Sequence, residues 1–316
     1  MSLWTKVSQG VKAVADGVER IVNKVGDVLG NAVEAVGDGI NDAFVWVGDR
    51  IGVRSLFAWP GGLFKGGFAL VGAGIKALFG FVACIVGGMI KIAGGLLTWR
   101  ISLLQEGALD ILSTLFGVIV VVAGKLVSLF QSIVYLQDFE RPLTAREKTQ
   151  LQTVFRDNLN YYVIRIVEGH SGLFGVNDRP FSLGNTIYMK KKTFPTDLLV
   201  HETTHVWQYQ QTGVRYASDA LLAQWFVDDA YNWQKEINTR RKTDWTRFNN
   251  EAQAQFLQDL WKYGELRDDS GATLQEGRGL AFTADWDTQF GYFEMGRNDY
   301  STIAKEAVKT VRKKWL

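Results

Sequence analysis

Residues 11–51 read VKAVADGVERI VNKVGDVLGNA VEAVGDGINDA FVWVGDRI, a run with a repeat of eleven residues. Eleven residues make almost three turns of an α-helix, so positions that are eleven apart return to the same face. Apolar residues recur at this step on one face and aspartates on another, the clearest apolar series being Val14, Val25, Val36 and Val47. The repeat therefore predicts an amphipathic helix of about fifty residues.

Glycine recurs with the same period, at Gly26, Gly37 and Gly48. A glycine inside a helix costs about 1 kcal/mol relative to alanine, so we expect this helix to need a surface or a partner to stay folded. A lipid interface and packing against other helices or sister subunits are the two alternatives. Residues 59–62 contain a proline and two glycines, which predict the end of this first region at residue 58.

A strongly apolar region follows, at residues 59–137. Lys76 is the only charged residue from 66 to 90, and Lys125 is the only one from 111 to 136. The residues between these segments include the charged Arg100, Glu106 and Asp110. The pattern predicts a glycine-rich hydrophobic helical hairpin.

The apolar hairpin is expected to meet a membrane. A helix of about 25 residues reaches roughly 37 Å, enough to cross a hydrocarbon layer of about 30 Å if its lysine snorkels or faces a partner. The fully uncharged runs at 77–90 and 111–124 are only fourteen residues long, which is short for a committed span. Two alternatives therefore stay open: membrane insertion, permanent or conditional, and a hairpin sequestered by other protein.

The charge, the single cysteine and the N-terminal sequence each bear on the class of function and on the location of the protein. The formal charge of +2 and the lack of a dense basic block before the C-terminal tail exclude an evident nucleic-acid footprint. Cys84, the single cysteine, lies in an apolar stretch and is expected to be a small buried residue without a disulfide. The N-terminus lacks the pattern of an ordinary signal peptide, so we expect export by another route or association with a membrane.

The character of the sequence changes abruptly after Gln137, where we expect a domain boundary. The remainder, residues 138–316, predicts an α+β domain with a small sheet. The whole chain is therefore predicted to be α+β and mainly helical. Its expected order is an amphipathic helix at 1–58, a hydrophobic helical hairpin at 59–137 and the α+β domain.

Local signals support this last domain. Thr144 and Glu147 form a capping-box pattern, which predicts a helix that runs to about residue 157. β-Branched and aromatic residues predict strands at 161–167 and 185–189. Helices are expected to dominate after the second strand.

The motif that carries chemistry is His201-Glu202-Thr203-Thr204-His205. On a helix, His-Glu-x-x-His puts two imidazoles one turn apart on one face, where they can bind one metal ion, with the glutamate beside the open coordination position. Pro195-Thr196-Asp197 supplies a helix start and Gly213 a stop. We therefore predict a metal site with a glutamate at its open position.

A catalytic zinc ion normally takes three protein ligands and leaves the fourth position to water, so a third ligand is needed. We favour Glu251, which begins a helical stretch well after the motif. Four other candidates stay open: His170, in a predicted loop, and the acidic residues Asp228, Asp229 and Glu236. Each of these four is equally well explained as an ordinary surface residue.

These motifs resemble those of the gluzincin class of zinc metallopeptidases, which pair His-Glu-x-x-His with a glutamate on a later helix. The resemblance covers about residues 140–262. Four segments look like the zincin-like domains found with bacterial toxins and with contractile or type VI injection systems: 141–144, 183–188, 201–208 and 251–254. Gln255 departs from the pattern, since one common gluzincin pattern has an aspartate at this position. An amide or another group must then orient the zinc histidine.

The resemblance implies that His201, His205 and Glu251 bind Zn2+ and that Glu202 is the general base. A donor for the oxyanion is also required, and Tyr209, Tyr231 and Arg215 are chemically able without the spacing selecting one. The strand at 186–189 is expected to be a sheet edge along which an extended peptide substrate pairs.

We therefore predict a zinc-dependent endopeptidase that acts on a protein or peptide, as a bacterial effector or toxin. Residues 1–137 would mediate membrane insertion or delivery, through a membrane or a partner in the injection machinery. The alternative is a pore-forming or structural component of an injection apparatus, in which the zincin-like domain is a scaffold or a self-processing module.

Overall fold

The computed structural model describes residues 3–50, 52, 54–133, 140–169, 172, 179–213, 216, 229–268, 270, 272–275, 277–284 and 290–313. The chain divides into two compact units. The helical unit comprises residues 1–139, 170–177 and 209–219, and the α+β unit comprises residues 140–169, 178–208 and 220–316. The predicted class, α+β and mainly helical, is confirmed.

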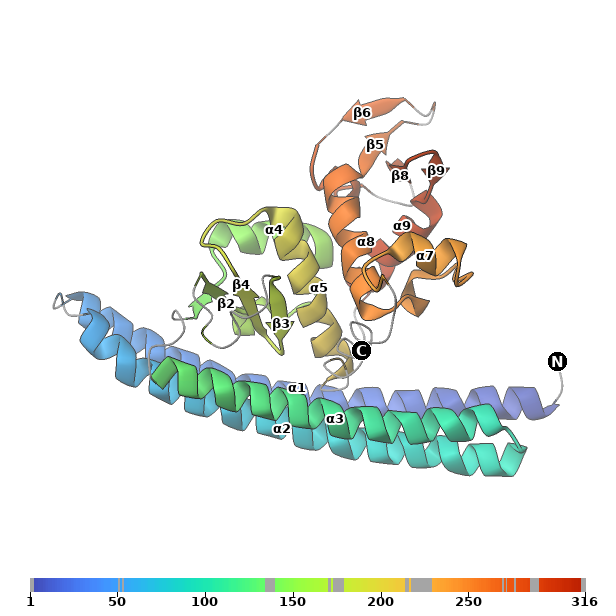
Figure 1. Cartoon of the computed structure of the whole chain (residues 1–316), viewed down its shortest axis with the longest axis horizontal. Coiled ribbons are helices and arrows are strands. Elements are labelled where there is room, and N and C mark those ends of the chain that lie inside the picture. Colours follow the sequence, from blue (N-terminus) through green and yellow to red (C-terminus); the bar gives the residue numbers. More distant parts are fainter. Residues whose placement is uncertain are drawn as a thin grey trace. The chain divides into compact units, whose positions relative to one another are not determined.

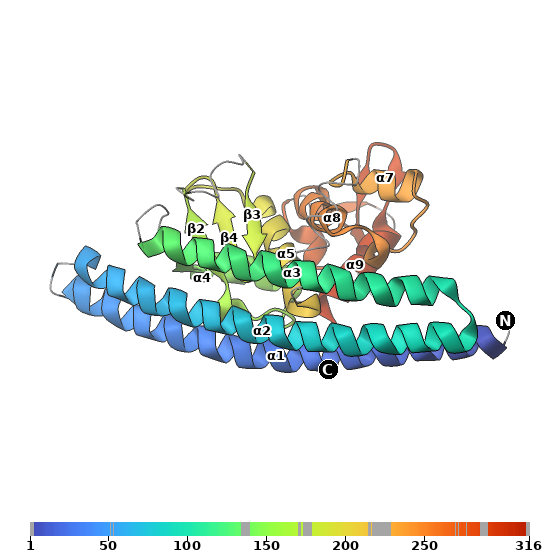
Figure 2. The ribbon, with the colours of Figure 1, turned by 60° about the horizontal axis from the view of Figure 1, so that its bottom comes forward.

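Three long helices make up the helical unit: α1 (Leu3–Arg50), α2 (Arg54–Thr98) and α3 (Ile101–Ile133). They run alongside one another, and α2 packs against both of the others (Figures 1 and 2). The predicted amphipathic helix is confirmed, since α1 has 48 residues.

The predicted helix end at residues 59–62 is wrong. The chain turns earlier, at Gly52, whose φ of 72° is a conformation that glycine adopts easily. α2 then begins at Arg54 and continues through residues 59–62. These residues lie near the start of a 45-residue helix, so the proline there removes a single backbone hydrogen bond from a long ladder.

The two helices of the hairpin are longer than the apolar segments 66–90 and 111–136 that predicted them. Its turn lies at Trp99 and Arg100, and Glu106 and Asp110 belong to α3 rather than to a loop. Residues Gly67–Thr98 and Ile101–Gln131 are each long and apolar enough to cross a membrane, with a mean hydropathy of 2.2 in their most apolar windows.

The glycine face of α1, not its valine face, packs against α2. A Cβ atom on Gly37 would come within 2.5 Å of the Phe68 Cβ atom, and one on Gly30 within 2.7 Å of the Gly72 carbonyl oxygen. These glycines therefore let the two backbones approach closely. The valine series remains exposed, with 59% of Val14 and 53% of Val36 accessible.

In the α+β unit, a four-stranded sheet contains β1 (Arg141–Pro142), β2 (Arg165–Glu168), β3 (Phe181–Leu183) and β4 (Thr186–Met189). The strand order is β1-β2-β4-β3. β2 and β4 are parallel, and the two outer pairs are antiparallel. The expectation that residues 186–189 form a sheet edge is therefore wrong, because β4 lies between β2 and β3.

Helices pack with this sheet in the α+β unit, beginning with α4 (Ala145–Phe155) and α5 (Thr196–Thr212). Three further helices follow, namely α7 (Trp233–Asn238), α8 (Asn250–Tyr263) and α9 (Ser301–Arg312). A second sheet has the order β6-β5-β7, from β5 (Glu265–Arg267), β6 (Thr273–Gln275) and β7 (Phe290–Tyr292), and β8 (Glu294–Met295) pairs with β9 (Asn298–Asp299).

The core of this unit is apolar and rich in aromatic residues. Phe256 lies at its centre, with ring contacts to Trp233, Phe248 and Phe293. The sheet contributes buried side chains such as Ile166 and Ile187 to the same cluster. This packing fixes α8 against the rest of the unit, which positions the residues at its first turn.

Local predictions for this unit hold with one adjustment. The capping box at Thr144 and Glu147 is present, and α4 follows it. The single strand predicted at 161–167 is instead a 3-10 turn at Tyr161–Val163 followed by β2, because the Asn160 side chain accepts a hydrogen bond from the Tyr162 backbone N–H.

Candidate metal centre

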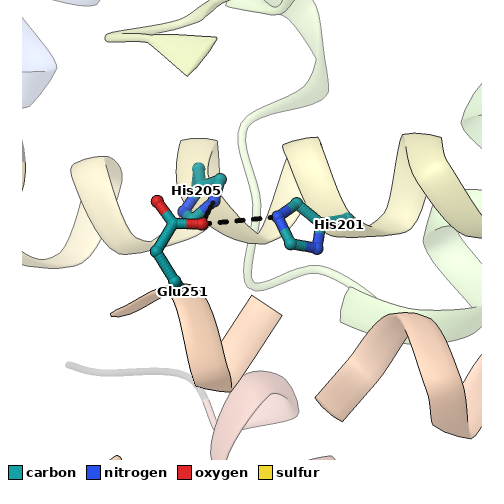
Figure 3. A group of neighbouring side chains, drawn as sticks. All are labelled: His201, His205 and Glu251. Atoms are coloured by element: carbon teal, nitrogen blue, oxygen red, sulfur yellow. Dashed lines mark ion pairs between the residues drawn. The ribbon is translucent and has the colours of Figure 1, made fainter. Parts of the chain in front are cut away.

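Two helices bring the predicted ligands together. α5 carries His201 and His205 one turn apart, and Glu251 lies in the first turn of α8 (Figure 3). The side chain of Asn249 caps α8 by accepting a hydrogen bond from the Ala252 backbone N–H. The carboxylate of Glu251 is therefore held at the positive end of the helix dipole.

The three side chains converge on one point. Oε2 of Glu251 lies 3.3 Å from Nε2 of His205 and 3.6 Å from Nε2 of His201 (Figure 3). All three side chains are buried, with at most 5% of each residue accessible. Among the residues that the structure describes, they form the one group of histidine, cysteine and acidic side chains that could hold a metal ion.

The charges of this cluster are strongly coupled. Burial disfavours a charged imidazole, yet the Glu251 carboxylate raises the pKa of His205 to about 9. Burial likewise opposes ionisation of Glu251, but the two imidazoles hold the pKa of this carboxyl below its usual range. In the metal-free protein, the site therefore favours a carboxylate facing a protonated histidine.

Glu202 lies on the same turn of α5, and it is also buried. Its carboxylate Oε2 lies 2.9 Å from the hydroxyl oxygen of Ser182, which donates to it from the edge strand β3. Burial raises the pKa of Glu202, and the nearby imidazoles offset part of this effect. A carboxyl group with a raised pKa beside a metal site suits a general base.

Amide side chains orient His205. Nδ1 of His205 lies 2.9 Å from Oε1 of Gln208, which can only accept a hydrogen bond. The Gln208 amide nitrogen donates to Oε1 of Gln253 at 2.8 Å and to the Asn250 carbonyl oxygen at 3.1 Å. These contacts keep a hydrogen on Nδ1 of His205 in either protonation state and leave Nε2 facing Glu251.

The direction of these amides is itself fixed by the backbone. The Gln253 amide nitrogen donates to the carbonyl oxygens of Trp245 and Thr246, at 3.3 and 3.2 Å. A carbonyl oxygen accepts only, so the Gln253 amide cannot be reversed without losing both bonds. Its oxygen must therefore face Gln208, which fixes the direction of the hydrogen bonds that link Gln253, Gln208 and His205. We call this chain of hydrogen bonds the amide relay.

Gln255 does not take part in the relay. Its amide nitrogen donates to Asp259, 3.0 Å away, and the other carboxylate oxygen of Asp259 accepts from the indole N–H of Trp233. Of the two alternatives left open, an amide or another group, the contact with His205 Nδ1 comes from an amide, that of Gln208. Gln208 lies three residues after His205, the spacing of neighbours on one helix face, and this is the signal that sequence reasoning overlooked.

The two other candidate ligands that the structure describes, Glu236 and Asp229, do not join the cluster. Glu236 is fully buried, but its carboxylate accepts hydrogen bonds from Arg240 and Asn249 and pairs with Lys242. Asp229 is exposed and pairs with Lys235. The two remaining candidates, His170 and Asp228, lie outside the described residues, as does Arg215.

One of the candidate oxyanion donors lies near the ligands. The ring of Tyr231 stacks on that of His201, with 6.0 Å between centroids, and the Arg179 guanidinium lies 4.9 Å from the Tyr231 ring. Burial and the Glu251 carboxylate raise the pKa of Tyr231 to about 12, so its hydroxyl keeps its proton at neutral pH. Tyr209 is buried and groups with the helical unit.

No protein-family model matches this chain, and no curated protein or solved structure does.

Proposed function

We propose that the α+β unit is a zinc-dependent endopeptidase. The observation that carries the proposal is the convergence of two imidazoles and one carboxylate beside a second, buried carboxylate, Glu202. This is the donor set of a zinc site that keeps one coordination position open. A structural site closed by four protein ligands would not leave a place for a reacting water.

The two separations that Glu251 makes with the histidines fit zinc. Four ligands at about 2.0–2.2 Å from a tetrahedral ion lie about 3.3–3.6 Å from one another. The two measured Nε2–Oε2 separations are 3.3 and 3.6 Å. The three ligand atoms all lie within 4.8 Å of one another, so adjustment of the imidazole side chains would be enough for the residues to hold the ion.

In this proposal, His201, His205 and Glu251 hold the metal. When bound, the metal acidifies a water molecule and polarises a peptide carbonyl. Glu202 takes a proton from the attacking water and later delivers it to the leaving amine nitrogen. Ser182 holds the Glu202 carboxylate in place, and Tyr231 donates a hydrogen bond to the carbonyl oxygen as negative charge develops.

The edge strand favours a peptide as the substrate. β3 pairs with β4 alone among the described strands, and proteins can bind an extended peptide by adding it to an edge strand. Ser182, at the centre of β3, already contacts Glu202. A peptide added to this edge would bring its backbone carbonyls beside the proposed general base.

The test is proteolysis of an unfolded protein substrate by the full chain. Wild type should cleave it, a chelator should stop cleavage and added Zn2+ should restore it. Glu202→Gln should lower the rate about 100-fold or more while the metal remains bound, since it removes the proton acceptor alone. Glu294→Gln, a change of the same chemistry at an exposed residue, is the matched control. Equal cleavage by wild type and Glu202→Gln would reject the mechanism.

For the whole chain, the function that fits best is that of a bacterial effector or toxin whose helical unit mediates membrane insertion or delivery of the peptidase. A second candidate is a pore-forming or structural component in which the α+β unit is a scaffold or a self-processing module. The large apolar side chains exposed on the helical unit support this second candidate. Dye release from lipid vesicles by the Glu202→Gln full chain separates the two, because only a pore former permeabilises vesicles without catalysis.

A further inference from the structure

In the helical unit, charged side chains lie inside and large apolar side chains lie outside, which is the reverse of a helical bundle that folds in water. The buried residues of the helical unit include few large apolar side chains but many polar or charged ones, among them Lys65, Lys76, Lys91, Asp110 and Lys125. Large apolar side chains lie outside instead, such as Val71, Leu78, Leu97, Leu112 and Ile119. Over residues 67–131, all of which the structure describes, Arg100 is the only exposed charged residue.

The buried lysines of α2 are neutralised chiefly by α1. Nζ of Lys76 lies 2.8 Å from Oε1 of Glu34, and these side chains are 1% and 10% accessible. Lys65 pairs with Asp38 at 3.6 Å in the same way. The acidic residues of the eleven-residue repeat and its neighbours thus face the cations of the hairpin.

Lys91 is held by acidic groups on both neighbouring helices. Its Nζ lies 2.8 Å from Asp16 on α1 and 2.6 Å from Asp110 on α3. The lysine and Asp110 side chains are each 2% accessible. The charge that interrupts the apolar sequence of α2 is therefore enclosed among all three helices.

Two ordinary explanations of long apolar helices do not fit α2 and α3. The core helix of a soluble protein is mostly buried, but only 39% and 28% of the most apolar windows are buried. A secretory signal lies at the N-terminus, whereas these segments begin at residues 67 and 101. Exposed large apolar side chains occur on both helices, for example Leu78 on α2 and Leu112 on α3.

We propose that α1 is the counter-charge partner that allows the α2–α3 hairpin to enter the hydrocarbon layer of a lipid bilayer. α1 accompanies the hairpin, with lysine–carboxylate pairs inside the bundle and the apolar side chains of α2 and α3 in contact with lipid. The exposed charged side chains of α1, such as Lys24 and Asp42, stay in contact with water. A lone charge in hydrocarbon is strongly unfavourable, and paired charges within a helix bundle are the arrangement that membranes tolerate. The inference rests on the proposed membrane role of this unit and names the element that makes it possible.

The hairpin turn has the character of an interfacial anchor. Trp99 is 93% accessible, and Leu97 and Ile101 beside it are 74% and 69% accessible. Arg100, the neighbouring exposed charge, donates a hydrogen bond to the Ser8 hydroxyl of α1. Tryptophan and arginine favour the boundary between hydrocarbon and water. The turn would therefore lie at a membrane surface with the start of α1 attached to it.

The test uses the full chain and vesicles of phosphatidylcholine and phosphatidylglycerol, with incorporation measured by flotation after an alkaline carbonate wash. Glu34→Gln keeps the shape of the side chain but removes the carboxylate that lies 2.8 Å from the Lys76 ammonium. Incorporation should fall about tenfold or more, because an unpaired charge at the centre of a span lowers partition by roughly two orders of magnitude. Lys76→Met alone should also lower it.

The decisive variant is the double change Glu34→Gln/Lys76→Met, which removes both charges and should restore incorporation to within about twofold of wild type. Asp42→Asn removes one negative charge from an exposed position of α1 and should leave incorporation unchanged. Circular dichroism of each variant checks that the helices still form.

Incorporation of wild type together with unchanged incorporation of Glu34→Gln would overturn the role of α1 and leave the membrane role standing. Failure of wild type to incorporate would overturn both. Self-association of the full chain in lipid-free buffer, without incorporation, would assign the apolar faces to a second copy of the chain and also reject the proposal.

Discussion

The two units are stabilised by opposite arrangements of residues. The α+β unit has an apolar interior, whereas the helical unit has charged residues inside and large apolar residues outside. The α+β unit buries aromatic and aliphatic side chains such as Phe256 and Leu257, and it uses buried charges chiefly at the candidate metal centre. The helical unit buries glycines and lysine–carboxylate pairs and exposes its large apolar side chains. The difference teaches that the hydrophobic effect drives the first unit to fold in water. The second is held by close backbone contact and ion pairs, as expected where the surroundings are themselves apolar.

A matched pair of Leu→Ala changes tests this contrast with the largest expected effect. Leu257 is fully buried in the α+β unit, so Leu257→Ala should lower the free energy of unfolding of that unit by about 2–5 kcal/mol. Leu112 is 63% accessible in the helical unit, so Leu112→Ala should change stability by less than about 0.5 kcal/mol. Calorimetric unfolding of the full chain measures both. Equal losses would break the comparison.

A pair of Gly→Ala changes in α1 tests the packing of the helical unit and should give opposite signs. A Cβ on Gly37 would crowd Phe68, so Gly37→Ala should destabilise the bundle by about 1–3 kcal/mol. A Cβ on Gly39 would meet nothing within 4 Å, so Gly39→Ala should stabilise α1 by about 0.5–1 kcal/mol through helix propensity. Thermal loss of helical circular dichroism reports both. Stabilisation by both changes would show that the glycine face is not an interface.

The amide relay in the α+β unit should affect metal binding more than folding. Gln208→Met removes the acceptor that orients His205, so the affinity for Zn2+ should fall about 10–100-fold. Gln258→Met is the matched control, since Gln258 on α8 donates to Asp197 and does not contact the ligands. Competition with a chromogenic chelator measures the affinity of each variant. An equal loss of Zn2+ affinity in Gln258→Met would show that the relay acts through the stability of the unit and not through the orientation of His205.

Much of the architecture follows from local sequence. The period of eleven predicts α1, the capping box at Thr144 predicts α4, and the spacing of His201 and His205 predicts a shared face on α5. These features depend on neighbours within one or two helical turns, which the sequence displays directly.

The predictions that failed concern contacts between segments that are distant in the sequence. The face of α1 that is covered was not predictable, because hydrophobicity favours the valines whereas close packing selects Gly37 and its repeats. Likewise, β4 was expected at a sheet edge, but the pairing with β3 places it inside the sheet. Gln253 became visible as part of the site only once α8 was packed beside α5.

The central claim is that His201, His205 and Glu251 form a zinc site with an open position. Metal analysis combined with X-ray absorption at the zinc edge tests it on the full chain. We predict one zinc ion per chain, with two histidine nitrogens at about 2.0–2.1 Å and a carboxylate oxygen at about 2.0–2.2 Å. Glu251→Ala should lose the carboxylate signal, and Glu236→Ala should keep it. The absence of bound zinc at one equivalent, or a ligand set without two histidines, would contradict the account.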